Sequence, residues 1–183
     1  KTQGRTLAAN LSTSRMIDDI ASRYGCTVLR TAVGEANVVS AMKESTSIVG
    51  GEGNGGVIWP RVTYVRDSLS AIALTIGLIK MFGKPLSAIA AEIPSYSIVK
   101  RKVDLSDTSQ ARAAAEKVAR HFASERLDLQ DGVRVDIESK RAWLHVRGSN
   151  TEPIMRLIAE APTTQIANQL LDEAARAIDL PGA

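Results

Sequence analysis

Apolar and polar positions follow two different patterns along this 183-residue chain, and the pattern changes near Pro94. Before Pro94, short apolar runs that indicate strands alternate with stretches of helical periodicity. The predicted strands are 5–10, 27–29 and 48–50, and the predicted helices are 12–24, 36–42, 66–82 and 85–92. This strand–helix alternation predicts a three-layer α/β domain with a mainly parallel sheet over residues 1–94. Its first residues read as a strand from the middle of a domain, so we expect the domain to be incomplete at its amino-terminal end.

After Pro94, apolar and charged residues alternate singly, as in strands with one exposed face. The predicted strands are 97–105, 133–138, 142–146 and 154–158, with amphipathic helices at 108–126 and 163–178. Residues 95–183 therefore form an expected α+β domain, in which an antiparallel sheet of about four strands is covered by two helices.

Composition narrows the functional classes. Hydrophobic residues make up 44% of the chain, aromatic residues 4%, and the net charge is +3. The basic residues are scattered and are not interleaved with aromatic ones, which argues against nucleic acid as a partner. A lone cysteine, Cys26, fits a reducing cytoplasm, and His121 and His145 lack the spacing of zinc ligands. The longest apolar run, Leu69 to Phe82, is too short and too polar to predict a membrane span.

A short polar loop between two predicted strands has the residue types that hold phosphate. It reads Arg-Gly-Ser-Asn-Thr-Glu-Pro from Arg147 to Pro153. Arg147 offers a planar fork of donors, Gly148 permits a turn in which backbone N–H groups converge on an anion, and neutral donors follow it: Ser149, Asn150 and Thr151. The alternative is a plain surface turn, because the same residue types are common in turns.

A glycine-rich loop follows the strand predicted at 48–50. Residues 50–56 read Gly-Gly-Glu-Gly-Asn-Gly-Gly, and their spacing fits a dinucleotide-binding fingerprint. The extended run Val57 to Pro60 argues against that function, because the fingerprint requires a helix directly after the glycines. A carboxylate at Glu52 and an amide at Asn54, flanked by Gly53 and Gly55, instead suit sugar hydroxyls. The alternative is a hairpin tip without a ligand.

Two further segments flank this loop in the predicted sheet. Val33-Gly34-Glu35 also follows a strand, so it is expected in the same crevice, at the carboxyl edge of the sheet. Arg66-Asp67 opens the long helix, where we expect helix capping and a local ion pair.

Together the two loops resemble motifs of the alpha-D-phosphohexomutase family, the phosphomannomutases, phosphoglucomutases and phosphoglucosamine mutases. Residues 51–56 resemble the sugar-binding loop of the family's third domain, and residues 147–153 the phosphate-binding loop of its fourth. The resemblance spans essentially the whole chain. It implies an enzyme fragment, the C-terminal half, because the sequence contains neither the family's phosphoserine segment nor its aspartate-rich magnesium loop.

The resemblance also implies a mechanism and partners. A phosphoserine in the missing half would exchange phosphoryl groups with a hexose 1- or 6-phosphate through a hexose bisphosphate. Arg147, Gly148, Ser149, Asn150 and Thr151 would hold the phosphate that does not react, and the segment from Glu52 to Gly55 would read the sugar. Magnesium would bind to the family's own N-terminal domains, so this chain should carry no metal and should be inactive alone.

The glycine-rich loop also departs from the family pattern. Many relatives carry serine where Asn54 stands and histidine where Gly56 stands, so the preferred hexose stays open among glucose, mannose and glucosamine phosphates. Two other interpretations also stay open: a non-catalytic module that binds sugar phosphates, and a structural protein whose two loops are idle.

Overall fold

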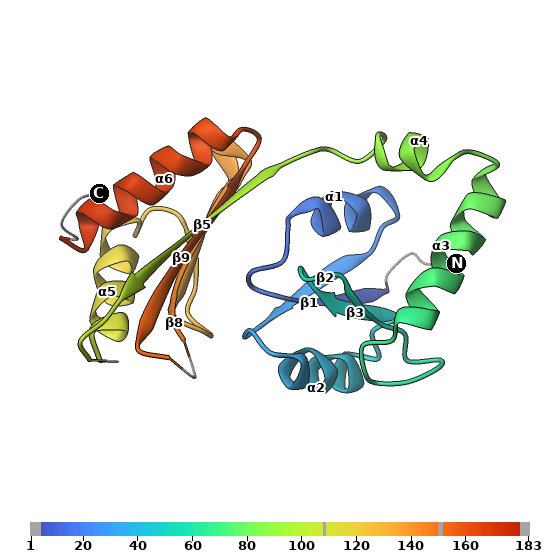
Figure 1. The fold of residues 1–183 in the computed structure, drawn as a ribbon, viewed down its shortest axis with the longest axis horizontal. Helices are drawn as coiled ribbons and strands as arrows, with labels where there is room; N and C mark the ends of the chain where they lie inside the picture. Colours follow the sequence, from blue (N-terminus) through green and yellow to red (C-terminus); the bar gives the residue numbers. More distant parts are fainter. Residues whose placement is uncertain (1–4, 108, 150–151, 180–183) are drawn as a thin grey trace. The chain divides into compact units, whose positions relative to one another are not determined.

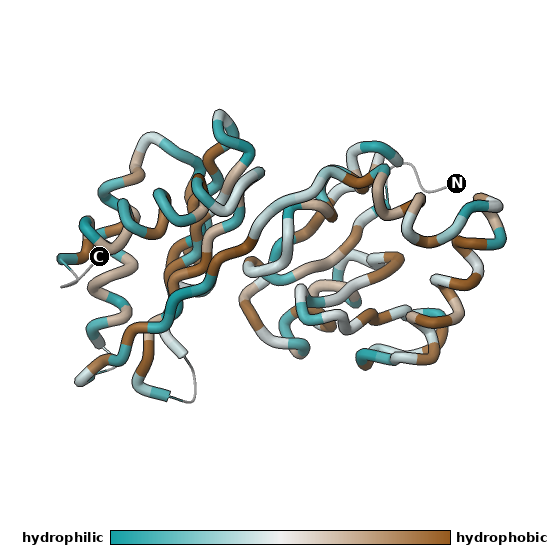
Figure 2. Tube along the Cα trace, turned by 45° about the horizontal axis from the view of Figure 1, so that its top comes forward, coloured by the Kyte–Doolittle hydropathy of each residue, from teal (hydrophilic) through white to brown (hydrophobic). Residues whose placement is uncertain are grey.

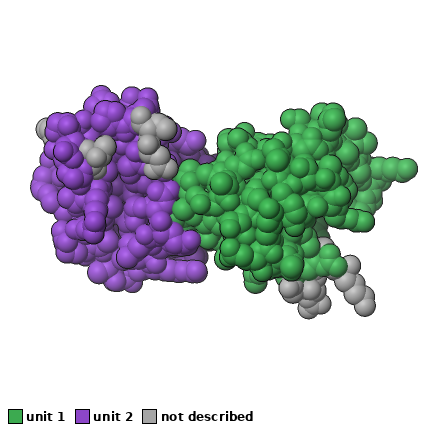
Figure 3. Space-filling model, turned by 90° about the horizontal axis from the view of Figure 1, so that it is seen from below, with its two compact units in different colours: residues 1–95 green, residues 96–183 purple. Residues whose placement is uncertain are grey.

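The computed structural model describes residues 5–107, 109–149 and 152–179. The chain forms two compact units, Lys1–Ser95 and Tyr96–Ala183 (Figure 3). Each has its own sheet and its own hydrophobic core. Across the described residues, no helix combines the length and the hydropathy that a membrane span requires.

The first unit is built on a four-stranded sheet with the order β2-β1-β3-β4. The first three of these strands are parallel, and β4 runs antiparallel to β3. The strands are β1 (Thr6–Asn10), β2 (Thr27–Thr31), β3 (Val49–Glu52) and β4 (Gly56–Ile58). The predicted α/β architecture with a mainly parallel sheet is confirmed.

The first unit also contains four helices, and the first two connect the parallel strands of its sheet. They are α1 (Met16–Arg23), α2 (Glu35–Ser45), α3 (Ser68–Phe82) and α4 (Leu86–Ala90). Helices α1 and α2 lie on opposite faces of the sheet (Figure 1), because the chain crosses from β1 outward to β2 and then back past β1 to β3. All parallel strands therefore end at one edge of the sheet, where their loops meet.

The second unit is an antiparallel sheet with the strand order β5-β9-β8-β7-β6. Its strands are β5 (Ser97–Asp104), β6 (Arg126–Asp128), β7 (Val133–Ile137), β8 (Ala142–Gly148) and β9 (Ile154–Ala161). A short 3-10 helix, η1 (Glu138–Lys140), joins β7 to β8, and α5 (Ser109–His121) and α6 (Thr164–Ala177) cover one face. The predicted α+β architecture with two helices is confirmed.

One strand of this sheet was not expected from the sequence. The helical pattern predicted a helix that continues to Arg126, but α5 ends at His121, and Arg126 begins β6. This three-residue strand pairs with β7 and makes the sheet five-stranded. Leu127 packs against the hydrophobic core, so burial and pairing with a distant strand override the local helical pattern.

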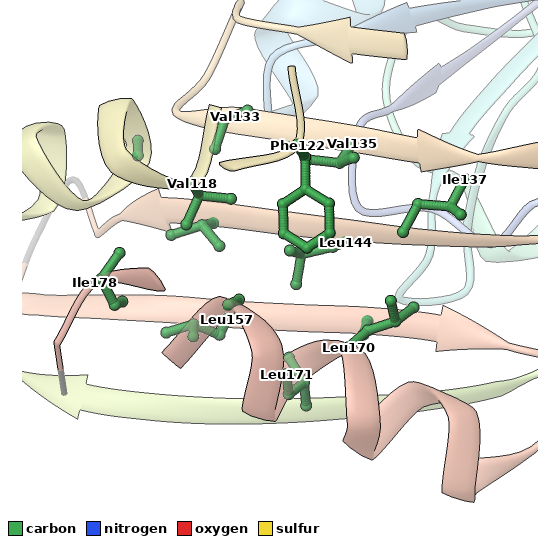
Figure 4. Close-up of a cluster of buried hydrophobic side chains, with 14 of the residues drawn as sticks. Val118, Phe122, Val133, Val135, Ile137, Leu144, Leu157, Leu170, Leu171 and Ile178 are labelled. Carbon is green, nitrogen blue, oxygen red and sulfur yellow. The ribbon is translucent and has the colours of Figure 1, made fainter. Parts of the chain in front are cut away.

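The core of the second unit lies between the sheet and its two helices. In Figure 4, Phe122 reaches toward the middle of the sheet near Val135 and Leu144, and Leu170 and Leu171 of α6 come from another side. Alternate residues of the central strand β8 face this core: Ala142, Leu144 and Val146 belong to the cluster, whereas Trp143 and His145 do not. The opposite face of β8 thus carries Trp143, His145 and Arg147.

Candidate functional site

The carboxyl edge of the first sheet brings three separate segments onto one carboxylate. Glu52 ends β3, Asn10 ends β1, and Gly34 precedes α2. The Nδ2 atom of Asn10 donates to Oε1 of Glu52 at 2.7 Å, and the backbone N–H of Gly34 donates to the same oxygen at 3.1 Å. The Glu52 side chain is only 9% exposed. Its orientation is therefore set by two hydrogen bonds before any ligand arrives.

Asn10 is itself held in one orientation. Its Oδ1 accepts hydrogen bonds from the backbone N–H of Ser12 at 3.0 Å and from Oγ1 of Thr13 at 2.8 Å. With the oxygen used in this way, the amide nitrogen is directed to Glu52. From the sequence, Asn10 was expected only as the end of a strand. The signal for its role was an apolar strand that ends in an amide, followed after Leu11 by the hydroxyl residues Ser12 and Thr13.

Arg66 adds a cation beside this carboxylate. Its backbone N–H and its Nε donate to the two oxygens of Glu35 at 3.0 and 2.7 Å, and its Nη1 lies 3.8 Å from Oε2 of Glu52. The backbone hydrogen bond from Arg66, followed by the side-chain one, lowers the pKa of Glu35 below its ordinary value. Gly34 and Glu35 thus lie at this edge, as expected from the sequence.

The expected capping at the start of the long helix is confirmed, whereas the expected local ion pair is not, because the partner of Arg66 is Glu35, 31 positions away. Asp67 accepts hydrogen bonds from the backbone N–H groups of Leu69 and Ser70, both at 3.1 Å, and caps α3. A side-chain hydrogen bond from Ser70 is the main cause that lowers the pKa of Asp67. The approach of Arg66 to Glu52 was not expected either.

The glycine-rich segment is a tight turn between β3 and β4. Gly53, Asn54 and Gly55 form its tip, and Gly55 has a φ of 89°, which favours glycine. Oδ1 of Asn54 accepts a hydrogen bond from the N–H of Gly56 at 3.3 Å, so this amide supports the turn. A Cβ atom at Gly56 would collide with the Arg66 side chain. The strand β4 follows the glycines, in agreement with the argument against a dinucleotide fingerprint.

In the second unit, Arg147 lies within β8, although the sequence predicted it in a loop. The strand continues to Gly148 because β9 pairs with both residues: Arg147 lies opposite Arg156, and Gly148 opposite Met155. Nε of Arg147 lies 2.8 Å from Oδ2 of Asp131, and the Arg147 side chain is only 8% exposed. The contact is an ion pair whose angle falls outside hydrogen-bond geometry. A rigid strand thus holds this cation, not a loop.

The turn at Asp131 and Gly132 lies against β8. Gly132 has a φ of 72°, and a Cβ atom there would collide with the carbonyl oxygen of Val146 and lie 2.8 Å from Cα of Arg147. Only glycine therefore permits this close approach. The approach places the carboxylate of Asp131 next to the guanidinium of Arg147. No part in the site was expected for Asp131 or Gly132 from the sequence.

His145 also contacts this turn. Its Nε2 lies 2.7 Å from the backbone carbonyl oxygen of Asp131, which can only accept, so Nε2 carries the proton. Burial lowers the pKa of His145 to about 4. The imidazole is therefore neutral near pH 7 and adds no second buried cation beside Arg147.

A groove of about 600 Å³ opens beside the end of β8. One wall is α5, and the other is the turn that contains Asp131. Two arginines of α5, Arg112 and Arg120, line it together with Gly148 and Ser149. The N–H of Ser149 donates to the carbonyl oxygen of Ile154 at 2.9 Å, which closes the base of the loop. Asn150 and Thr151 lie outside the described residues.

The predicted site residues thus form one group in each unit. Glu52, Gly53, Asn54 and Gly55 lie at the carboxyl edge of the first sheet, and Arg147, Gly148 and Ser149 at the end of β8. Asn10, Arg66 and Asp131 are the additional residues that shape these groups. Among the residues that the structure describes, no group of three or more His, Cys, Asp or Glu side chains is arranged to hold a metal ion.

Two family models match consecutive parts of the chain. The model described as "Phosphoglucomutase/phosphomannomutase, alpha/beta/alpha domain III" matches residues 1–96. The model described as "Phosphoglucomutase/phosphomannomutase, C-terminal domain" matches residues 98–177. Nearly the entire chain is thereby covered by two successive domains of one family.

Curated relatives carry related names. A probable phosphoglucosamine mutase of Methanopyrus kandleri is 36% identical over 168 residues, which are 91% of this chain and 37% of that protein. A phosphoglucomutase/phosphomannomutase of Thermococcus kodakarensis is 33% identical over 169 residues, with 92% and 37% of the two chains covered. The chain therefore spans little more than a third of the length of these relatives.

Solved structures share the fold. A phosphoglucomutase/phosphomannomutase family protein of Burkholderia thailandensis superposes with a TM-score of 0.80 at 21% identity, over 100% of this chain and 39% of that one. An Aspergillus fumigatus N-acetylphosphoglucosamine mutase in complex with GlcNAc-6P and magnesium gives a TM-score of 0.66 at 14% identity, over 97% and 39% of the chains.

Proposed function

The chain belongs to the phosphoglucomutase/phosphomannomutase family, and from this premise we propose that it is the substrate-binding half of a phosphohexomutase. The parent enzyme would interconvert hexose 1-phosphates and hexose 6-phosphates. The observation that carries the proposal is the match of both units to consecutive domains of one enzyme family. The two groups of side chains described above give each unit a separate task.

The second unit would bind the phosphate group that does not react. Arg147 is positioned by a strand and by Asp131, so little side-chain freedom is lost when an anion binds. The hydroxyl group of Ser149 adds a neutral donor beside it, and Gly148, Asn150 and Thr151 belong to the same proposed clamp. The groove wall carries two arginines, Arg112 and Arg120, and two acidic residues, Glu116 and Asp131, so the cation of this clamp is Arg147.

The first unit would bind the sugar. A carboxylate accepts hydrogen bonds from hydroxyl groups, and Glu52 is already oriented by Asn10 and Gly34. The glycines at positions 53 and 55 let a ligand approach the backbone closely. Asn54 would supply a further polar contact with the sugar. Relatives are named for glucosamine, glucose and mannose phosphates, so the proposal names the hexose phosphate class and no single sugar.

Catalysis would rest on groups outside this chain. A phosphoserine would transfer its phosphoryl group to the open hydroxyl of the hexose monophosphate, and the resulting bisphosphate would return its other phosphoryl group to the serine. Phosphoryl transfer depends mainly on positioning and on charge stabilisation. This chain would contribute the positioning, whereas the proposed magnesium ion would be held by the N-terminal domains of the parent.

Turnover of a hexose 1-phosphate tests the proposal. The parent protein should convert glucose, mannose or glucosamine 1-phosphate to the 6-phosphate, and residues 1–183 alone should bind the sugar phosphate without converting it. Turnover by residues 1–183 alone would show that catalytic groups lie within them. A parent gene that encodes neither a serine loop nor an aspartate-rich loop before Lys1 would instead favour a non-catalytic sugar-phosphate-binding module.

A further inference from the structure

Helix α3 is apolar on every side and yet exposed. Lys80 is its only charged residue, and Ser70 is its only buried one. The side chains of Leu69, Ile76 and Met81 are 76%, 60% and 74% exposed, and the tube of this helix is mostly brown in Figure 2. A helix that is hydrophobic all round is normally buried. The exposure of α3 therefore departs from the usual placement of such a helix.

The exposed side chains form a defined surface. Leu69, Ile72 and Ile76 are three and four residues apart and share one stripe of the helix. Leu74 and Met81 extend the exposed area to a second side. We call this surface the α3 patch: Leu69, Ile72, Leu74, Ile76, Met81 and Phe82. Single exposed apolar residues are ordinary, whereas a continuous patch marks an interaction site.

The core of the first unit is small as well. Its hydrophobic cluster consists of four buried residues, Ala8, Val38, Met42 and Ile58, with Val39 packed against them. The cluster of the second unit contains nineteen buried residues, although the two units have similar lengths. Helix α3 contributes nothing to the smaller cluster. The first unit therefore has apolar surface available for another structural element.

We propose that the α3 patch binds an apolar helix from the part of the parent protein that precedes Lys1. This inference rests on the proposed function, because it takes the chain to be one part of a longer enzyme. The chain spans 37% of the length of its relatives, and the family model for residues 1–96 describes an alpha/beta/alpha domain. A further helix beside α3 would add to a helical layer of that architecture.

A second copy of this chain is a weaker candidate for the occupant. The α3 patch consists of six side chains on a single fifteen-residue helix, whereas a stable interface between separate proteins usually involves roughly 20–30 residues on each partner. A covalently connected segment needs less area, because it does not lose the translational freedom of a separate molecule.

The test compares the same substitutions in two proteins, residues 1–183 and the full-length parent. Ile72→Lys and Ile76→Lys should leave the melting temperature of residues 1–183 within about 2 °C, because both side chains already face solvent. In the parent, each should lower it by at least about 5 °C, because a lysine would enter an apolar contact. The control is Tyr24→Lys, at an exposed position after α1, which should change the melting temperature of both proteins by the same amount.

Equal melting shifts in both proteins would overturn the inference, as would a gene product that begins at Lys1. If both proteins form dimers and Ile72→Lys abolishes the dimers, the inference is also overturned, because a second copy of the chain then covers the α3 patch. The outcome is separable from that of the proposed function. If the parent shows the selective destabilisation but has no mutase activity, only the proposed function is refuted. If the parent is an active mutase but does not show the selective destabilisation, only the proposed occupant of the α3 patch is refuted.

Discussion

Asn10 and Glu52 meet across two neighbouring parallel strands, where Nδ2 of Asn10 donates to Oε1 of Glu52 at 2.7 Å. The two residues are 42 positions apart in the sequence, so only the crossover through α1, β2 and α2 brings them together. The bond leaves Oε2 of Glu52 on the side of Arg66, 3.8 Å from Nη1. A carboxylate with one oxygen fixed by the protein is suited to offer the other to a ligand.

Glu52→Gln should lower the affinity for glucose 1-phosphate roughly 10- to 150-fold, the equivalent of about 1.5–3 kcal/mol for a hydrogen bond to a charged group. The affinity for inorganic phosphate should stay the same, because phosphate is assigned to the other unit. Calorimetric titration of both ligands measures this. Glu44→Gln, at an exposed carboxylate of α2 that pairs with Ser40, is the matched control. Equal losses for both ligands would refute the division of tasks.

Arg147→Ala should weaken the binding of inorganic phosphate and of glucose 1-phosphate alike, by roughly 10- to 150-fold. The reason is that the substitution removes the charge-assisted donor. The control is Arg101→Ala, which removes a partly exposed arginine of the same unit that pairs with Asp172 on α6. Calorimetry should show full affinity in the control. Unchanged phosphate binding in a folded Arg147→Ala protein would exclude this arginine from the site.

Gly132→Ala should destabilise the second unit more than Gly83→Ala destabilises the first. Both glycines have positive φ, 72° and 62°, so each alanine costs about 1–2 kcal/mol of backbone strain. Only at Gly132 does the new Cβ also collide with the backbone of β8, which adds roughly 1–3 kcal/mol. Chemical denaturation of each variant measures both free energies of unfolding. Equal losses would mean that the turn at Asp131 does not press against β8.

The stability of the second unit should fall as the pH is lowered from about 6.5 to about 4. His145 has a pKa of about 4 in the folded protein because it is buried, whereas its unfolded pKa is about 6.5. Between these values the unfolded chain binds more protons, so stability is complete above pH 6.5 and is lost as the pH falls toward 4. The loss amounts to about 3 kcal/mol.

Denaturation of wild type and His145→Gln across this pH range isolates the effect. The difference between their free energies of unfolding should shrink as the pH falls. A His145→Gln protein with the wild-type slope would show that another group produces it.

The sequence was sufficient for the elements whose signals are local. The alternation of strands and helices before Pro94 predicted the parallel sheet, and the capping role of Asp67 followed from its place before an apolar helix. Because loops that follow parallel strands meet at the carboxyl edge of a sheet, Gly34 and Glu52 were expected to lie close together, and they share a hydrogen bond. In each case the deciding residues are close in sequence, or a general rule of topology connects them.

What the sequence could not provide depends on distant contacts. Arg147 lies in a strand because β9 pairs with it, and its guanidinium is fixed by Asp131, which precedes it by sixteen residues. The short strand β6 forms because β7 offers a free edge and the core accepts Leu127. The role of Asn10 required knowing that β1 lies beside β3. No local sequence pattern predicts these pairings.

We propose that Glu52 and its neighbours read the sugar of a hexose phosphate and that Arg147 and its neighbours bind the phosphate, and nuclear magnetic resonance titration of residues 1–183 with glucose 1-phosphate tests this claim. The backbone amides of Gly53 and Gly55 should shift together with those of Gly148 and Ser149, and all four should fit a single Kd. Inorganic phosphate should move only Gly148 and Ser149. Shifts that are confined to one group at saturating sugar phosphate, or two unrelated Kd values, would contradict the claim.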